Sequence, residues 1–214
     1  MAIKFISFDL DGTLTTTDFD TCIWKEEIIK LYAEKHKLSF DKAYKRVWEE
    51  YDKVPAWTLD WLDIKFWFNH FDFKKDWREV FENCKGKIEL YPEVEEVLKE
   101  LKKKYKLVLI TNSTREFMDI KFRTTHIDKY FDHSFSATSD FVRGKRGANI
   151  FKRIGKILKA KPNEILHVGD DLVFDYKNPT SMGMNALLLD RKNRTDVENR
   201  RINNLKDINK FIDF

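Results

Sequence analysis

Five short apolar runs, separated by segments of helical periodicity, restrict the fold of this 214-residue chain more than any other feature. We expect strands at residues 3–9, 106–111, 133–136, 165–169 and 185–189. Between the later runs, apolar residues recur at helical spacing, which predicts helices over 92–104, 114–125, 147–160 and 171–182. Strands that alternate with helices indicate an α/β fold with a doubly wound parallel sheet, a Rossmann-like core. In such sheets ligands bind beyond the carboxyl ends of the strands.

One segment interrupts this alternation, because residues 16–88 show helical patterns only. We expect its helices at roughly 20–37, 40–53, 58–71 and 75–85. All six tryptophans lie in this segment, namely Trp24, Trp48, Trp57, Trp61, Trp67 and Trp77. Aromatic residues at helical spacing form the core of a small bundle more often than they bind a cofactor. The sequence therefore predicts a core domain of residues 1–15 and 89–214 and a small all-helical domain of residues 16–88.

The charge of the chain is weakly basic, with a formal net charge of +4 although 36% of the residues are charged. Such a surface field favours anionic partners without requiring nucleic acid. The densest basic stretches, residues 102–104 and 191–201, lack the interleaved aromatic side chains of a nucleic-acid platform, so we expect solvated surfaces there. We expect a monomer or a homodimer that binds no nucleic acid.

The sequence carries no sign of secretion or of membrane insertion. No apolar run approaches the length of a membrane span, and Asp9 lies so near Met1 that a signal peptide has no room. We therefore expect a cytoplasmic protein with no membrane partner. Cys22 and Cys84 are the only cysteines, too few and too far apart in sequence to indicate a disulfide framework or a metal cluster, so we expect both thiols to stay reduced.

Two acids, Asp9 and Asp11, close the first apolar run, and Gly12 follows them directly. In a continuing strand the two carboxylates would point to opposite faces, but glycine lets the backbone turn sharply at this point. Two acids at the end of a strand suit Mg²⁺ binding and phosphoryl chemistry. The alternative is a solvated Asp-Gly turn. A fixed Asp-x-Asp-Gly-Thr arises by chance at on the order of one in 10⁵ positions, which disfavours that alternative.

Three further segments complete a recognisable series. Residues 111–113, Thr-Asn-Ser, end the second apolar run, residues 144–147 form a basic glycine-flanked turn, and residues 169–171, Gly-Asp-Asp, end a later run with Asp175 beyond it. In this order the chain resembles the haloacid dehalogenase superfamily, whose four motifs lie at the C-terminal ends of parallel strands. The resemblance extends from residue 3 to about residue 190. It implies that residues 16–88 are a mobile helical cap over the site.

The resemblance also implies roles for the first two acids. Asp9 would attack phosphorus and carry the phosphoryl group as an aspartyl phosphate. Asp11 would protonate the leaving oxygen and later activate the water that hydrolyses the intermediate. For this purpose Asp11 must be protonated part of the time, which we expect the field of neighbouring carboxylates to favour. Thr13 is expected to support the turn rather than to take part in the chemistry.

Carboxylates that converge on one pocket repel one another unless a divalent cation lies between them. We expect Mg²⁺, bound by Asp9, by Asp170 and by the backbone carbonyl of Asp11, with water at the remaining positions. Asp171 either binds this metal through water or caps the following helix, and the sequence leaves both interpretations open. His167, inside the apolar run before these acids, is expected to be a satisfied core histidine.

The remaining site residues would contact the phosphoryl group. The Thr111 hydroxyl and the Asn112 backbone amide can donate hydrogen bonds to phosphate oxygens. By resemblance, Lys145 offsets the charge shared by Asp9 and the phosphoryl group, and Asp175 orients this lysine.

The choice of Lys145 rests on spacing, because one position departs from the pattern of the superfamily. Its third motif usually has a proline directly after the lysine, and Arg146 stands there in this chain. The spacing onward to Phe151 still fits Lys145. Arg143, Arg146 and Lys152 remain alternatives.

The resemblance implies a hydrolase, a Mg²⁺-dependent phosphatase that acts on a small phosphorylated metabolite. A phosphomutase on the same scaffold would use the same acids. A 2-haloacid dehalogenase is a weaker alternative, because its chemistry needs no metal and such members lack the acid that Asp11 supplies here. A binding module without turnover is the remaining alternative, and the sequence does not identify the substrate.

Overall fold

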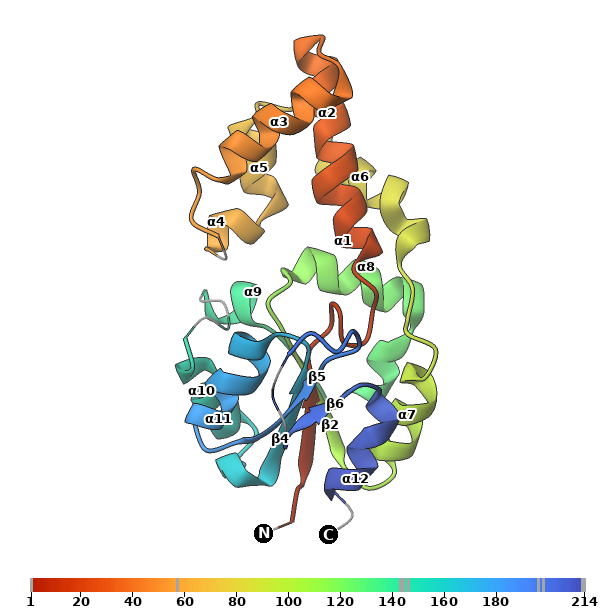
Figure 1. Cartoon of the computed structure of the whole chain (residues 1–214), viewed down its shortest axis with the longest axis vertical. Helices are drawn as coiled ribbons and strands as arrows, with labels where there is room; N and C mark the ends of the chain where they lie inside the picture. Colours follow the sequence, from red (N-terminus) through yellow and green to blue (C-terminus); the bar gives the residue numbers. More distant parts are fainter. Residues whose placement is uncertain are drawn as a thin grey trace.

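The computed structural model describes residues 2–56, 58–142, 145, 147–195, 197 and 199–212. Its centre is a six-stranded parallel sheet in the order β3-β2-β1-β4-β5-β6 (Figure 1). The strands are β1 (Phe5–Phe8), β2 (Lys106–Thr111), β3 (His133–Ser136), β4 (Ile165–Gly169), β5 (Asn185–Leu189) and β6 (Arg201–Ile202). The predicted α/β class and all five predicted strands are confirmed. The sequence missed β6, which has only two residues.

Helices cover both faces of this sheet (Figure 1). The α-helices of the core are α7 (Val94–Lys102), α8 (Arg115–Thr125), α9 (Ala137–Phe141), α10 (Asn149–Ile157), α11 (Asn178–Ser181) and α12 (Asn209–Ile212). Shorter elements are the π-helix η5 (Leu172–Lys177) and the 3₁₀ turns η3 (Ile127–Tyr130), η4 (Pro162–Glu164) and η6 (Leu205–Ile208). The helix expected over 171–182 is therefore divided into η5 and α11, and α9 was not predicted.

The apolar runs are continuous because the sheet is buried on both faces. On one face, Phe8 and Leu109 belong to a cluster with Leu98 of α7. On the other face, Val108 belongs to a cluster with Phe151 of α10. This two-sided packing leaves the carboxyl edge of the strands as the part of the sheet where polar side chains can gather.

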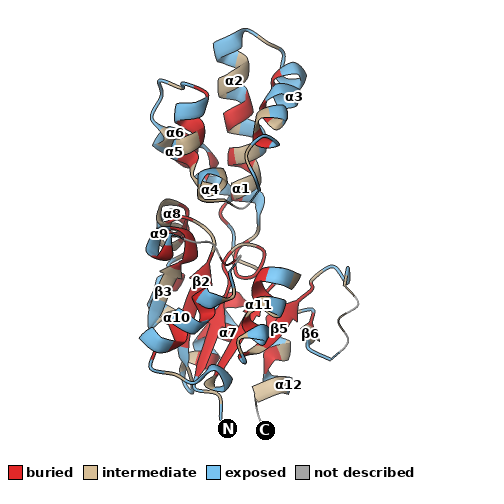
Figure 2. Ribbon diagram, turned by 90° about the vertical axis from the view of Figure 1, so that its left-hand side faces the viewer, coloured by how far each residue is buried: buried red, intermediate tan, exposed pale blue. Residues whose placement is uncertain are grey.

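The segment 16–88 is helical as expected and stands above the carboxyl edge of the sheet (Figures 1 and 2). Its elements are α1 (Asp18–Cys22), η1 (Ile23–Glu27), α2 (Ile28–His36), α3 (Phe40–Tyr51), α4 (Leu59–Leu62), α5 (Ile64–His70), α6 (Trp77–Cys84) and η2 (Lys85–Lys87). A second apolar cluster holds them together, with Trp67 fully buried in it and Trp24, Trp48, Trp61 and Trp77 packed against it. Phe117 and Ile120 of α8 also belong to this cluster, so it joins the segment to the core. Trp57 lies outside the described residues. The cluster agrees with the interpretation of these aromatic residues as a bundle core.

The two cysteines form a disulfide, so the expectation of two reduced thiols was wrong. Cys22 ends α1 and Cys84 ends α6, and their Cα atoms lie 5.8 Å apart. They are 62 residues apart in sequence, a separation that says nothing about distance once the helices fold back on one another. The disulfide joins the first and the last α-helix of the 16–88 segment.

Candidate active site

The turn after β1 brings the first two acids to the carboxyl edge of the sheet. Gly12 has a φ of +81°, in the left-handed region that favours glycine. A Cβ atom at this position would also collide with the carboxylate of Asp170, which follows β4. Gly12 is therefore required by conformation and by space, and the turn places the Asp9 and Asp170 segments against each other.

A buried lysine holds Asp9. Lys145 Nζ lies 2.5 Å from Asp9 Oδ1 and 2.6 Å from Asp175 Oδ1, and the lysine side chain is only 2% exposed. Burial raises the pKa of Asp9 well above its usual range. The charge of Lys145 lowers this pKa, but the charges of Asp175 and Asp170 raise it, so the net shift is upward. Burial opposes the charge of Lys145, but Asp175 and Asp9 together raise the pKa of this lysine. Lys145 is therefore a cation at neutral pH.

The loop that carries Lys145 is held on both sides. The Lys145 backbone N–H donates to Asn112 Oδ1 at 2.5 Å, and Asn178 Nδ2 donates to the Lys145 carbonyl at 2.8 Å. Asn112 thus positions the lysine, a role that the sequence did not suggest. Of the alternatives to Lys145, Lys152 is exposed on α10, whereas Arg143 and Arg146 lie outside the described residues.

Three carboxylates form the candidate metal centre. One oxygen from each of Asp9, Asp170 and Asp175 lies within 4.8 Å of the others. Asp175 already accepts hydrogen bonds at both oxygens, from Lys145 and from the Asp171 backbone N–H. Loss of surrounding water and the charge of Asp175 raise the pKa of Asp170 to about 6, as expected for acids crowded together without a cation between them. Oxygen ligands of this kind suit Mg²⁺, and Asp9 and Asp170 have the freer oxygens.

Asp171 and His167 have structural partners. Asp171 Oδ1 accepts hydrogen bonds from the backbone N–H groups of Val173 and Phe174 at 2.8 and 2.7 Å. Asp171 therefore caps η5, which is one of the two interpretations that the sequence left open. His167 is fully buried, with Nε2 3.1 Å from Asp175 Oδ1 and Nδ1 2.8 Å from Ser7 Oγ. The core interpretation of His167 is confirmed, and the histidine also orients Asp175.

Thr111 and Thr13 line the same edge. Thr111, at the end of β2, is buried, and its Oγ1 accepts a hydrogen bond from the Ser113 backbone N–H at 3.1 Å. Thr13 Oγ1 donates to Asp170 Oδ1 at 3.3 Å. Thr13 therefore supports Asp170 as well as the turn.

Asp11 has a partner that the sequence did not reveal. Lys121 of α8 is fully buried and donates to Asp11 Oδ1, while Ser113 Oγ donates to Asp11 Oδ2. Lys121 Nζ also lies 2.7 Å from Asp20 Oδ2, on α1. The missed signal was a lysine four residues after Phe117 on the apolar face of a predicted helix, because a charge in that position needs a buried partner.

The expectation that neighbouring carboxylates would protonate Asp11 was wrong. Burial raises the pKa of Asp11, but the Lys121 charge and the hydrogen bonds from Lys121, Ser113 and Thr15 lower it below its ordinary value. The acid with the raised pKa is Asp20 instead, because burial and the charge of Asp11 raise its pKa to about 6. In this arrangement Asp11 is a carboxylate.

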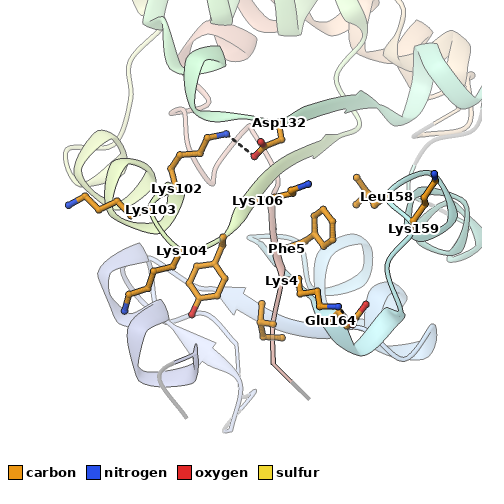
Figure 3. Close-up of a pocket in the computed structure, with 12 residues that line it drawn as sticks. Lys4, Phe5, Lys102, Lys103, Lys104, Lys106, Asp132, Leu158, Lys159 and Glu164 are labelled. Carbon is orange, nitrogen blue, oxygen red and sulfur yellow. Dashed lines mark hydrogen bonds and ion pairs between the residues drawn. The ribbon is translucent and has the colours of Figure 1, made fainter.

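A second concave surface lies at the opposite edge of the sheet. It is a groove of about 610 Å³ around the start of β1 and β2. Several lysines are among the residues that line it (Figure 3). Lys102 lies 2.7 Å from Asp132 and Lys4 lies 2.6 Å from Glu164, so acids neutralise part of this surface. The groove is remote from Asp9.

None of the helices in the described ranges combines the length and the apolar character of a membrane span.

Comparison with known proteins points to one family. The chain matches the family of haloacid dehalogenase-like hydrolases over residues 3–177. It is 26% identical over 183 residues to a protein named pyrophosphatase PpaX from Bacillus mycoides (strain KBAB4), a match that covers 80% of this chain and 76% of the relative. The structure of a HAD phosphatase from Thermococcus onnurineus is 26% identical, with a TM-score of 0.86 over 97% of each chain. A 2-haloacid dehalogenase from Pseudomonas syringae pv. Tomato DC3000, 22% identical with a TM-score of 0.71 over 97% of each chain, shares the fold.

Proposed function

Because the chain belongs to the haloacid dehalogenase-like hydrolases, we propose that it hydrolyses a small phosphorylated metabolite, with Mg²⁺ and through an aspartyl phosphate on Asp9. The observation that carries this proposal is the buried contact of Lys145 with Asp9, beside the carboxylates of Asp170 and Asp175. The names of the two relatives at 26% identity, a pyrophosphatase and a phosphatase, favour phosphoryl chemistry over dehalogenation.

The first step transfers the phosphoryl group to the protein. A carboxylate oxygen of Asp9 forms a bond to phosphorus as the bond from phosphorus to the leaving oxygen breaks, and the leaving oxygen takes up a proton. Lys145 lies against Asp9 and can stabilise the negative charge of the transferred group. The Thr111 hydroxyl and the Asn112 backbone N–H are the proposed donors to the phosphate oxygens.

A second step returns the protein to its starting state. Water attacks phosphorus, the bond between phosphorus and Asp9 breaks, and inorganic phosphate leaves. The attacking water must lose a proton, and Asp11 can accept it because its contacts with Lys121 and Ser113 keep it a carboxylate. The same proton can then serve the leaving oxygen of the next turnover, so that Asp11 alternates between base and acid.

Mg²⁺ fits the donor set of this site. Asp9, Asp170 and the backbone carbonyl of Asp11 would hold it, and Asp175 would stay with Lys145. When bound, the cation supplies positive charge that offsets the acids and the phosphoryl oxygens. The proposal predicts that exhaustive chelation abolishes hydrolysis and that added Mg²⁺ restores it, whereas full activity after chelation would favour the dehalogenase alternative.

We propose the 16–88 segment as a cap that selects the leaving group. A cavity of about 160 Å³ lies among its aromatic side chains, with Trp24, Tyr51 and Trp67 in the wall and Thr17 and Asp20 on the side of the core. Asp20 links this cavity to Asp11 through Lys121. Substitutions in the cavity should therefore change the relative kcat/KM of different esters more than the hydrolysis of small esters.

The direct test is detection of the intermediate and of its product. Purified protein is given p-nitrophenyl phosphate and a panel of phosphate esters with Mg²⁺, and released phosphate and the mass of the quenched protein are measured. We expect phosphate release and a phosphorylated Asp9. A sugar monophosphate that is isomerised rather than hydrolysed would favour the phosphomutase alternative, and no turnover of any ester would favour a binding module. The cytoplasmic location and the monomeric or dimeric state stay predictions, to be tested by cell fractionation and light scattering.

A further inference from the structure

We propose that the loop after β5 binds a second anionic group of the substrate, beside the phosphoryl site. This inference rests on the proposed phosphatase function and narrows its substrate class. It concerns a cavity of about 330 Å³, which has Gly12 and Asp170 on one side and Arg191, Lys192 and Arg194 on the other. Figure 1 shows the loop after β5 running close to the turn after β1.

The cavity adjoins the catalytic acids. Gly12 lies so close to the Asp170 carboxylate that no Cβ atom fits between them, and Asp170 shares the candidate metal centre with Asp9. Asp170 lines the cavity and also belongs to the candidate metal centre, so a second anionic group in this cavity would lie beside a phosphoryl group held at Asp9.

Arg191 fixes the start of the loop against the catalytic turn. Its Nη1 lies 2.6 Å from Glu93 Oε1, its Nη2 donates to the Thr13 carbonyl at 2.9 Å, and its guanidinium carbon lies 3.6 Å from the centre of the Tyr91 ring. These contacts occupy both terminal nitrogens of Arg191. They also hold the next residues of the loop at the rim of the cavity.

Lys192 and Arg194 are the cations left for a ligand. Both are exposed, and within the described part of the chain neither forms an ion pair with a carboxylate. Asp190, the other acid of the cavity, accepts hydrogen bonds from the Thr195 N–H at 2.8 Å and from its hydroxyl at 3.0 Å. The acids at positions 196 and 198 of the same loop lie outside the described residues.

This arrangement suits a substrate with two anionic groups a few bonds apart. A phosphoryl group at Asp9 would be joined to a second phosphate or to a carboxylate, which would accept charge-assisted hydrogen bonds from Lys192 and Arg194. Both sources present anionic oxygen atoms, and their recognition differs only in the number and spacing of those atoms. A neutral leaving group would gain nothing from these two residues.

The test compares substrates that differ in the second charge. 2-Phosphoglycolate and ethyl phosphate differ by a carboxylate in place of a methyl group, and inorganic pyrophosphate supplies a second phosphate. We expect the wild-type protein to prefer at least one of the two substrates with a second anionic group over ethyl phosphate in kcat/KM. The double substitution Lys192→Ala/Arg194→Ala should reduce that preference by ~10-fold or more. Lys99→Ala/Lys103→Ala removes the same charge from exposed positions in the last turn of α7 and directly after it, and is the matched control.

Each result has one meaning. A reduced preference for 2-phosphoglycolate assigns a carboxylate to the cavity, and a reduced preference for pyrophosphate assigns a second phosphate. Equal loss with the control variant, loss that is the same for ethyl phosphate, or a wild-type protein without preference overturns the inference. A wild-type protein that hydrolyses other esters of the panel but none of these three also overturns the inference, whereas hydrolysis of no ester at all overturns the proposed function.

Discussion

Two buried lysines each lie between two carboxylates, and the comparison between them explains much of this site. Lys145 joins Asp9, at the end of β1, to Asp175 in η5, so its cluster belongs to the core alone. Lys121 joins Asp11 to Asp20 of α1, so its cluster connects the core to the helical segment above it. Both clusters therefore consist of one lysine between two carboxylates, but only the second one links the core to the helical segment.

The two clusters also shift the pKa values of Asp9 and Asp11 in opposite directions. Burial and the nearby acids raise the pKa of Asp9 despite Lys145, whereas the donors around Asp11 overcome its burial and lower its pKa. Both lysines are shared, so sharing does not explain the difference. Asp11 also accepts hydrogen bonds from Ser113 and Thr15, which lower its pKa, whereas the charges of Asp175 and Asp170 raise the pKa of Asp9 against the effect of Lys145.

The largest effect that separates the clusters is expected from Asp9→Asn. This variant should fold but lose turnover by ~10³ or more, because the covalent route disappears, and it should form no phosphoenzyme. Asp11→Asn should instead accumulate phosphoenzyme with p-nitrophenyl phosphate, whose leaving group needs little protonation. Quenched-flow mass spectrometry distinguishes these outcomes, and phosphoenzyme in Asp9→Asn would remove Asp9 as the nucleophile.

Lys145→Ala should give the next largest effect. We expect kcat to fall by ~10² to 10³, the scale of losing one electrostatic stabiliser of the transferred group. Lys152→Ala, at an exposed position of α10, is the matched control and should leave kcat near the wild-type value. If Lys145→Ala were mild and Arg143→Ala or Arg146→Ala severe, the neutralising role would move to one of those arginines.

Loss of the disulfide tests how much the cross-link stabilises the helical segment that carries Asp20 of the second cluster. Cys22→Ser/Cys84→Ser should lower the free energy of unfolding by about 2–4 kcal/mol, since a cross-link between distant residues restricts the unfolded chain. Denaturant titration measures this change, and the wild-type protein with a reductant is the control. No difference between reduced and oxidised wild-type protein would contradict a disulfide in the native state.

Asp20→Asn should give the smallest effect, one that depends on pH. The folded protein holds the Asp20 proton up to about pH 6, whereas the ordinary pKa is 3.8, so the folded state binds more protons between these values. The Asp20 contribution to stability therefore falls as the pH rises through this interval. Relative to wild type, Asp20→Asn should gain up to about 3 kcal/mol between pH 4 and pH 6, as one pKa unit is about 1.4 kcal/mol. Asp18→Asn, exposed on the same helix, should show no such trend in thermal or denaturant unfolding.

The first cluster was largely predictable because its members follow strands. Asp9 and Asp170 end apolar runs, and parallel strands bring their carboxyl ends to one edge of the sheet. Spacing was enough to choose Lys145 even without the usual proline, and the structure places it on Asp9. The capping role of Asp171 was one of two local interpretations, and the geometry of η5 distinguishes them.

The second cluster could not be predicted, because no local pattern joins its members. Lys121 is 110 residues from Asp11 and 101 residues from Asp20 in the chain. Sequence periodicity places Lys121 on a helix but does not say which carboxylates that helix face meets. Without this lysine, the neighbouring acids alone suggested a raised pKa for Asp11, whereas Lys121 and its hydrogen bonds lower it.

The sequence by itself determined the alternation of strands and helices, the helical interruption and the acids at the strand ends. These features follow from side-chain periodicity and from backbone turns, which act over a few residues. Only the tertiary structure decided the partner of Asp11, the disulfide between Cys22 and Cys84, and the approach of the Arg191 loop to the turn after β1. All three join residues far apart in the chain. A buried charge such as that of Lys121 requires a partner, wherever in the sequence that partner lies.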